Sequence, residues 1–579
     1  MTEHSTTTPA TPQSPTRPTT PRQVADAYVA AACELDPMLA TQLGVAPGED
    51  RLPDLSPEGL AADEGLVRDT LAELDRVLAE DPALDDDPVE RRCARLLRER
   101  LSAELDAHRA GEGFRALNNL FSPVHSVRQI FSLMPAASDD DWAVIGRRMA
   151  RVPEAYRAYR TTLEEAVRRD LLVAPRQVRT VVEQLDEWLA GPYFASFVAA
   201  GPDSLRTELL AAASAADAAV ADIRDFLRDE YGPRTEGVPD AVGRDRYAMA
   251  VRRWTGSDLG PAQGLEEAYA WGWAEHQRIL AEQRIEADRV QAGATPMEAM
   301  RLLATSGPAV EGVEEIRVRL QSMMDEAIAE LDGRHFDLAE PIRRVEAMIA
   351  PPGSAAAPYY TRPSQDFSRP GRTWLPTQGR TRFPLWDLVS IWYHEGVPGH
   401  HLQLAQWAYV ATELSTYQAS VGSVGANVEG WALYAERFMD ELGYFRDPGT
   451  RLGFLDAQQL RSVRVVIDIG MHLQLPIPDD AEGALAEHRG QPWTPDLARA
   501  FLGENSGAAV AFLDSELVRY LGLPGQAISY KLGERAWLAG RAAAQERRGA
   551  DFDLKAWHMA ALSQGSLGLD DLEAELAQL

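Results

Sequence analysis

Three of the chain's 11 histidines lie within one short segment, HEGVPGHH, which runs from His394 to His401. Two histidines with a glutamate close by are typical of a helix that holds one zinc ion, where the glutamate takes the proton of the attacking water. His394 and Glu395 open such a motif. The segment therefore predicts a zinc-dependent hydrolase, with His394 as a ligand and Glu395 as the general base.

The second histidine does not lie where a regular helix needs it. On a straight helix His401 would be about 10.5 Å along the axis from His394, too far to share one ion. Pro398 lacks the backbone N–H that a helix uses, and Gly399 accepts almost any conformation, so the pair predicts a kink or bulge. Looping out the pair brings His400 to the place of the second ligand, and we favour it over His401. The alternative to a metal site is a plain turn with solvated histidines.

A catalytic zinc site needs a third protein ligand, and a carboxylate completes one established set. The helical pattern NVEGWALYAERFMDELG carries Glu429 in its first turn and Glu436 two turns later, so only one of the two can reach the ion. Glu429 lies among the small residues Gly425, Ala426 and Gly430, which let a second helix approach closely. The alternative is a carboxylate that simply favours a helix N-terminus.

Apolar residues recur at three- and four-residue spacing over most of the chain, which predicts a mainly α-helical protein. The segments with this pattern include 24–39, 90–110, 141–171, 204–231 and 312–333. Between 343 and 384 the chain is rich in Pro, Gly and aromatic residues, which predicts a small β-sheet beside the cleft.

We expect three parts along the chain. Residues 1–22 are mostly Thr, Pro and Ser, which is typical of a disordered tail. A helical N-terminal lobe is expected over 23–342 and a catalytic lobe with the metal site over 343–579.

The composition restricts partners and compartment. The formal charge is −30, from 88 acidic and 58 basic residues, and such a field repels nucleic acid. Two cysteines, Cys33 and Cys93, cannot form a disulfide framework, which fits a reducing compartment. The N-terminus has no apolar signal region and no apolar run is long enough for a membrane span. We expect a cytoplasmic protein without membrane partners; the sequence does not predict an oligomeric state.

Several ordered segments together resemble a bacterial family known as domain of unknown function 885. They are YHEGVPGHHLQ, EGWALYAE, VVIDIGMH and PGQAISYKLG, with RPG at 369–371 ahead of them. That family is in turn similar to helical zinc peptidases of the thimet oligopeptidase and carboxypeptidase Taq type. The resemblance implies a large two-lobed, zincin-like fold, the ligands His394, His400 and Glu429, and Glu395 as general base. The Pro-Gly insertion departs from the pattern of those peptidases and affects only the second histidine.

The resemblance also gives candidate roles to residues nearer the C-terminus. Tyr530 corresponds to a tyrosine that donates its O–H to the tetrahedral intermediate in the similar peptidases. His472 lies four residues after Asp468 on one helix face and is a candidate to bind substrate or the oxyanion. Arg461 and Arg464 are candidates to neutralise a substrate carboxylate. The alternatives are a buried, satisfied histidine, a core tyrosine and ion-paired arginines.

The function predicted from the sequence is a zinc-dependent hydrolase that cleaves a peptide or small amide substrate. One alternative is a zinc enzyme with a non-peptide metabolite as substrate, because a fold does not dictate a reaction. Another is a non-catalytic helical binding protein whose metal is purely structural.

Overall fold

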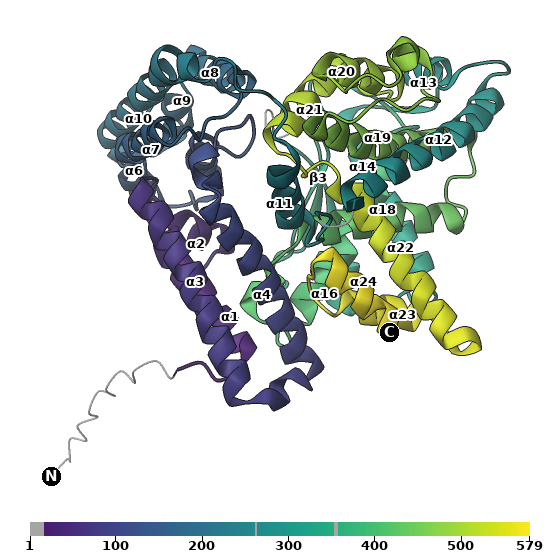
Figure 1. Cartoon of the computed structure of the whole chain (residues 1–579), viewed down its shortest axis with the longest axis horizontal. Helices are drawn as coiled ribbons and strands as arrows, with labels where there is room; N and C mark the ends of the chain where they lie inside the picture. Colours follow the sequence, from purple (N-terminus) through teal and green to yellow (C-terminus); the bar gives the residue numbers. More distant parts are fainter. Residues whose placement is uncertain (1–16, 261–262, 352–356) are drawn as a thin grey trace.

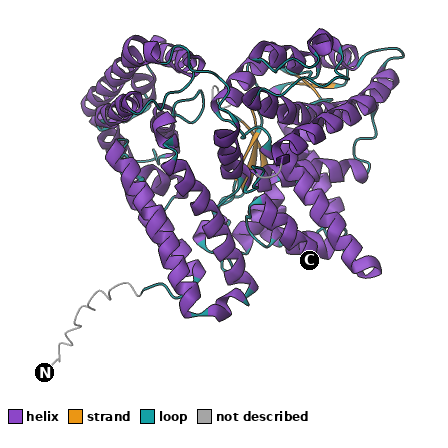
Figure 2. Ribbon diagram, viewed as in Figure 1, coloured by secondary structure: helices purple, strands orange, loops and turns teal. Residues whose placement is uncertain are grey.

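The computed structural model describes residues 17–260, 263–351 and 357–579. The fold is mainly α-helical, as the apolar spacing predicts, with a few short strands (Figures 1 and 2). In the first half of the chain the helices are α1 (Pro21–Leu35), α2 (Pro37–Leu43), α3 (Pro57–Glu80), α4 (Pro88–Arg109), α5 (Pro123–Gln129), α6 (Asp139–Met149), α7 (Val152–Arg168), α8 (Pro175–Ala190), α9 (Tyr193–Val198), α10 (Arg206–Phe226), α11 (Arg244–Thr255) and α12 (Gly264–Val290).

The remaining helices follow in the second half of the chain. They are α13 (Pro296–Ser306), α14 (Val313–Leu331), α15 (Leu388–Glu395), α16 (His400–Tyr409), α17 (Thr416–Ala419), α18 (Gly425–Glu441), α19 (Pro448–Leu473), α20 (Pro495–Glu504), α21 (Val510–Gly522), α22 (Ser529–Arg548), α23 (Leu554–Leu562) and α24 (Leu569–Gln578). In the part of the chain that the structure describes, no helix combines the length and apolar character needed to cross a bilayer.

Two small sheets form next to the metal segment, largely where the sequence predicts them. β2 (Val345–Ile349) pairs in parallel with β4 (Gly371–Leu375), whose other edge pairs antiparallel with β3 (Tyr359–Thr361). β5 (Arg382–Pro384) pairs antiparallel with β1 (Ala309–Glu311), which lies outside the predicted stretch. The three-residue β1 is too short to show an alternating pattern in the sequence.

Figure 1 shows α1–α10 on the left and α11–α24 on the right. One separate apolar core takes buried residues only between Met38 and Tyr231. α12 packs along α19, so closely that a Cβ on Gly272 would lie 2.7 Å from the Val465 side chain. The boundary expected at 342/343 stays a prediction, because residues of α1, α3 and α4 share one apolar core with the C-terminal helices.

The first helix begins inside the segment that the sequence predicts as a tail. Residues 1–16 lie outside the described residues, but α1 already begins at Pro21, inside the predicted tail of 1–22. The Thr20 side chain caps this helix by accepting from the N–H of Gln23, and proline at the first helical position is preorganised for a helix.

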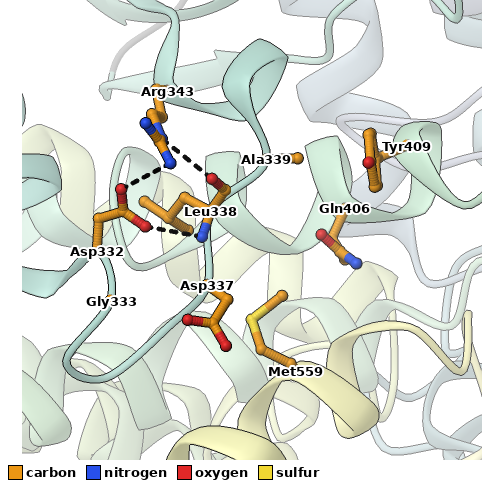
Figure 3. Close-up of a pocket in the computed structure, with 9 residues that line it drawn as sticks. All are labelled: Asp332, Gly333, Asp337, Leu338, Ala339, Arg343, Gln406, Tyr409 and Met559. Carbon is orange, nitrogen blue, oxygen red and sulfur yellow. Dashed lines mark hydrogen bonds and ion pairs between the residues drawn. The ribbon is translucent and has the colours of Figure 1, made fainter.

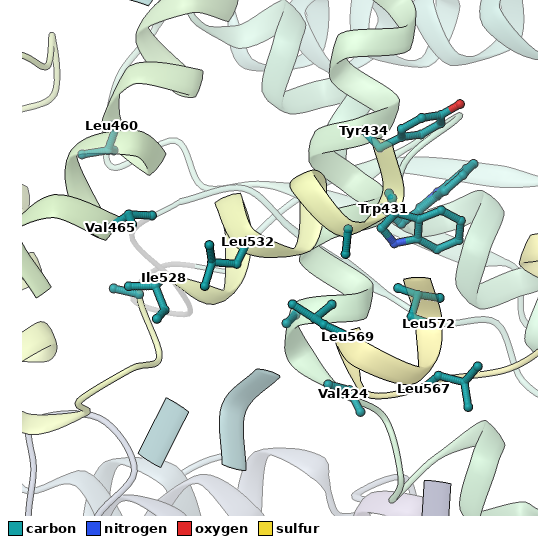
Figure 4. Close-up of a cluster of buried hydrophobic side chains, with 14 of the residues drawn as sticks. Val424, Trp431, Tyr434, Leu460, Val465, Ile528, Leu532, Leu567, Leu569 and Leu572 are labelled. Carbon is teal, nitrogen blue, oxygen red and sulfur yellow. The ribbon is translucent and has the colours of Figure 1, made fainter. Parts of the chain in front are cut away.

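α18 and α22 cross at two glycines, and this crossing brings together the helices that carry Glu429 and Tyr530. A Cβ on Gly430 would lie 2.4 Å from the backbone carbon of Gly533, and one on Gly533 would lie 2.0 Å from the carbonyl oxygen of Ala426. Apolar side chains from α18, α19, α22 and α24 fill the space around the crossing (Figure 4).

The crossing leads to a prediction for Gly430→Ala. Its added methyl meets backbone atoms that cannot rotate away, so α18 and α22 must separate, at a cost of about 1–3 kcal/mol in the free energy of unfolding. Urea unfolding measures this change. Gly425→Ala is the matched control, because a Cβ at this exposed position on the same helix meets no atom within 4 Å. Equal stability of the two variants would contradict the close crossing.

Candidate metal centre

A tight turn separates the two histidine-bearing helices. α15 ends with His394 and Glu395, and α16 begins at His400. A Cβ on Gly399 would lie 1.9 Å from the carbonyl oxygen of His394, so only glycine fits there. The N–H of Gly399 donates to the carbonyl of Tyr393 at 3.0 Å. The helix is therefore interrupted completely, whereas the sequence predicted a kink or bulge within it.

Helix α18 hydrogen-bonds to the backbone of this turn. The indole N–H of Trp431 donates to the carbonyl oxygens of Pro398 at 2.9 Å and Gly399 at 3.1 Å. Trp431 is fully buried and lies two residues after Glu429 on the same helix. The same helix thus supplies both the clamp for the turn and the predicted third ligand.

The structure brings the three predicted ligands together. The rings of His394 and His400 lie 4.7 Å apart between centroids. Glu429 Oε2 lies 3.3 Å from Nε2 of His394 and 3.6 Å from Nε2 of His400. One ligand atom from each residue lies within 4.8 Å of the other two. Two imidazole nitrogens and one carboxylate oxygen form the His₂Glu set of catalytic zinc sites.

His401, the alternative second ligand, points away from this cluster. Its Nδ1 hydrogen-bonds the hydroxyl of Tyr360 at 2.9 Å and its Nε2 hydrogen-bonds the carbonyl of Ile342 at 2.7 Å. Burial lowers the pKa of His401 to about 4, so the ring stays neutral. Gly371 of β4 lies against this ring, where a Cβ would be 2.5 Å from its Nδ1. Both nitrogens are engaged, so His401 ties α16 to the sheet.

Glu436 has a role that sequence reasoning did not assign. Its Oε1 lies 2.8 Å from Nδ1 of His394, and its other oxygen accepts from the hydroxyl of Ser390. A carboxylate on the far nitrogen fixes the ring orientation and makes the metal-facing nitrogen more basic. The seven-residue spacing from Glu429 was the available signal, because two helical turns return a side chain to nearly the same face.

The charges of the cluster suit a cation. Burial lowers the pKa of His394, but the contacts with Glu429 and Glu436 outweigh burial and raise it to about 9. Burial raises the pKa of Glu429, but the two histidines outweigh it and hold this pKa far below its ordinary range. The cluster therefore stabilises positive charge between its ligand atoms, and the residues fit a zinc ion.

Glu395 lies at the edge of the cluster, as expected for a base. Its Oε2 is 4.0 Å from Nε2 of His400, and the residue is 7% exposed. Burial raises the pKa of its carboxyl group, while His400 and His394 oppose this shift. A carboxylate with a raised pKa is better matched to accepting and returning a proton near neutral pH.

Tyr530 lies close enough to Glu429 for the carboxylate to affect its hydroxyl group. The negative charge of Glu429 and then burial raise the pKa of Tyr530, so its hydroxyl keeps its proton. The guanidinium of Arg464 lies 4.8 Å from the centre of its ring. Among the described residues, the Tyr530 hydroxyl makes no hydrogen bond, which leaves this donor available.

His472 is not brought to the cluster. It lies eleven residues after Arg461 on α19, about 16 Å along the helix, whereas Arg461 itself lies 3.9 Å from Glu436. Its Nε2 hydrogen-bonds the carbonyl of Tyr520 at 3.1 Å, and its ring packs against Tyr247. The placement corrects the expected oxyanion role, because a fully buried ring at this distance cannot reach the reacting atoms.

Arg464 is also occupied elsewhere. It donates to Glu516 at 2.6 Å and to the hydroxyl of Tyr520 at 2.9 Å. Arg519 donates to the same carboxylate. A guanidinium held by these partners is a support for the ring of Tyr530 rather than a binding group for a substrate carboxylate.

A separate cavity is lined in part by α16 and contains none of the cluster residues. This cavity of about 470 Å³ is lined by residues of the α14–β2 connection and by Gln406, Tyr409 and Met559 (Figure 3). In its lining, Arg343 forms an ion pair with Asp332 at 2.9 Å, and the N–H of Leu338 donates to Asp332 at 3.0 Å (Figure 3). Its charged groups are thus largely satisfied within the protein.

The contacts of the two neighbouring histidines lead to a prediction on zinc content. His400→Ala removes a predicted ligand, so the prediction is that the folded variant binds no stoichiometric zinc while the wild type does. His401→Gln should keep its zinc and lose stability instead, because it weakens the contacts to Tyr360 and Ile342. Metal analysis of the monomeric fraction after gel filtration measures both. Zinc loss in the His401 variant with retention in the His400 variant would reverse the assignment.

The buried carboxyl group of Asp468 leads to a prediction on pH dependence. Burial raises its pKa to about 7, although the Tyr247 hydroxyl and the Gly525 N–H donate to it. Its unfolded pKa is about 3.9. The folded state therefore binds the proton more tightly, and the stability present below about pH 4 is lost as pH rises towards 7, by about 1.4 kcal/mol per pH unit.

Asp468→Asn carries no charge, so its free energy of unfolding should exceed that of the wild type at pH 8 and lack this slope. Urea unfolding at several pH values measures the difference between the two proteins. A constant difference from pH 4 to pH 8 would show that Asp468 does not titrate in this range.

Two solved bacterial structures share this fold. A "putative lipoprotein" from Colwellia psychrerythraea has a TM-score of 0.81 and 21% identity, covering 96% of this chain and 98% of that one. A "putative lipoprotein of unknown function" from Shewanella oneidensis has a TM-score of 0.70 and 18% identity, covering 96% of this chain and 99% of that one. The curated proteins contain no match.

The sequence profile described as bacterial protein of unknown function, DUF885, matches residues 37–576. This match covers almost the whole chain and includes every residue of the cluster. The chain therefore belongs to the DUF885 family of bacterial proteins.

Proposed function

We propose that the chain is a zinc-dependent hydrolase of peptide or related amide bonds. The observation that carries the proposal is the position of Glu395, a buried carboxylate 4.0 Å from His400 at the edge of the three-ligand cluster. A purely structural ion needs ligands alone and has no use for a nearby base. The likeness of these motifs to thimet oligopeptidase and carboxypeptidase Taq type peptidases supports the same reading and a zincin-like fold.

His394, His400 and Glu429 would hold the ion. Zinc bound there would lower the pKa of water and polarise a carbonyl group. Glu395 then accepts a proton from the attacking water on its carboxylate and delivers it to the leaving amine. The Tyr530 hydroxyl donates to the oxygen that becomes negative as the water adds to the carbonyl carbon.

The exposure of the cluster favours catalysis over a structural metal. The side chains of His394 and His400 are 4% and 10% exposed, whereas that of Glu429 is 26% exposed. Glu429 is therefore the most exposed of the three candidate ligands. A closed structural site would shield all of its ligands.

Location and partners remain predictions. A cytoplasmic location follows from the sequence alone, whereas the two solved relatives carry the description "putative lipoprotein". A lipoprotein is held at a membrane surface by its acyl chains. Cell fractionation with an antibody to this chain decides between the two locations. The exclusion of nucleic acid continues to rest on the charge of −30.

The proposed mechanism predicts different effects for the base and for the metal ligands. Glu395→Gln should keep stoichiometric zinc but lower kcat for peptide hydrolysis by about 10²–10⁴-fold, because the amide cannot accept the proton. Digestion of a mixed peptide library, with and without chelator, together with metal analysis measures both properties. Loss of zinc or full activity in this variant would contradict the assignment. A zinc-loaded wild type that cleaves no peptide would favour a non-peptide substrate.

Tyr530→Phe removes only the hydroxyl and should lower kcat by about 10²–10³-fold, with little change in KM, because the bond forms in the transition state. Tyr409→Phe is the matched control, since this tyrosine of α16 is 52% exposed and lies outside the cluster. A Tyr530 variant with wild-type kcat would exclude the oxyanion role.

A further inference from the structure

A second cavity is lined by residues of α12, α13 and α20, and none of the cluster residues belongs to its lining. Its volume is about 520 Å³. Small-molecule sites occupy roughly 300–1,000 Å³, whereas one water molecule occupies only about 30 Å³. Helix α12 contributes Trp273, Gln277, Leu280 and Arg284 at three- and four-residue spacing. This spacing places the four side chains on one face of the helix, so α12 forms a continuous wall of the cavity.

The aromatic residues of the lining are buried and uncharged. The rings of Trp273 and Phe501 stack with their centroids 5.7 Å apart and their planes at 22°. The ring of His276 packs edge-on against Phe501 at 5.0 Å. Burial lowers the pKa of His276 to about 4, so this ring is neutral near pH 7. Flat rings without charge favour a flat, neutral group over an ion as their neighbour.

The charged residues of the lining are all exposed and balance one another. They are Arg284, Arg301, Glu482 and Glu504. Arg284 donates to Glu482 at 3.0 Å, so one positive and one negative group already form a pair. Two cations and two anions give the lining no net charge. The cavity therefore offers no electrostatic preference for a charged ligand.

Gln283 adds an unused amide group to this lining. The residue is 2% exposed, and its Nε2 is buried without a partner among the described residues. By contrast, the equally buried Gln177 donates through its Nε2 to the carbonyl of Val518 at 2.8 Å. An unpaired buried amide is costly, and it presents a donor and an acceptor side by side. The Gln283 amide is therefore suited to pair with a group that enters the cavity.

We propose that this cavity is a binding site for a neutral aromatic or heteroaromatic molecule that carries a carbonyl group next to an N–H. The ring of the ligand contacts Trp273 and Phe501. Its carbonyl oxygen accepts from Nε2 of Gln283, and its N–H donates to Oε1 of the same side chain. The inference is independent of the proposed hydrolase function, because the site shares no residue with the cluster.

The test uses 2-quinolone, a flat two-ring lactam whose carbonyl group lies next to an N–H. N-methyl-2-quinolone is the matched probe, because it keeps the rings and the carbonyl but has no N–H. Saturation-transfer NMR titrations of the full chain should give a Kd of about 1 mM or tighter for 2-quinolone. The N-methyl compound should bind about tenfold more weakly. Equal affinity for the two probes would overturn the pairing with Gln283.

Two variants locate the probe in the cavity. Gln283→Leu keeps a side chain of similar size without the amide, so the preference for 2-quinolone over its N-methyl form should vanish. Leu280→Trp places a large ring in the cavity and should abolish binding of both compounds. If 2-quinolone binds Leu280→Trp as it binds the wild type, the probe lies elsewhere and the inference is wrong.

The stability of the protein without a probe separates a binding role of Gln283 from a structural one. Gln283→Leu removes a buried amide that has no partner, so it should unfold at the same or a higher urea concentration than the wild type. Gln177→Leu is the matched control. It loses the bond to Val518, so it should be less stable but keep the preference for 2-quinolone. A loss of stability in Gln283→Leu as large as that in Gln177→Leu would assign Gln283 to the fold and contradict the binding role.

Discussion

The candidate site depends on one close backbone contact, the approach of Gly399 to the carbonyl oxygen of His394. No side chain fits between them, since a Cβ would lie 1.9 Å from that oxygen. The contact ends α15 and starts α16 within four residues, so that two imidazole rings from different helices face one another. On a continuous helix, six residues would separate the same rings by about 9 Å along the axis. The chemistry proposed for the cluster exists only because this turn replaces a helical segment.

Helix α18 makes that turn rigid and completes the cluster. Trp431 clamps the carbonyls of the turn, Glu429 supplies the third ligand atom, and Glu436 orients the first histidine. Gly430 lets α22, the helix that carries Tyr530, cross α18 closely. The residues with these four roles thus lie within about two turns of one helix. Ligand geometry is held best by residues that are themselves locked by packing and hydrogen bonds, and this arrangement meets that condition.

The sequence predicted the helical class, the small sheet and the residues that meet at the cluster, because residue type and short-range spacing encode them. The break in the helix at Pro398-Gly399 could be predicted from the backbone chemistry of proline and glycine. That the helix ends there completely could not be predicted, because the turn is held by a tertiary contact with Trp431. His400 and His401 are adjacent and chemically identical, and only the contacts of His401 with Tyr360 and Ile342 separate them. His472 shows the limit of such reasoning. Its spacing from Asp468 predicts that both residues share one helix face, but it does not predict what that face packs against or how deeply it is buried.

The charges around the cluster would suit a bound cation. Glu395, Glu429 and Glu436 are three acidic groups within a few ångströms of two histidines. Arg461 offers one positive charge nearby but donates to none of them. Buried charge of one sign is strongly unfavourable unless it is paired, and protons on the histidines are one way to pair it. The pKa of about 9 at His394 reflects the negative charge of the neighbouring carboxylates. A divalent cation bound between the three candidate ligands would balance the same charge and would let the histidines stay neutral.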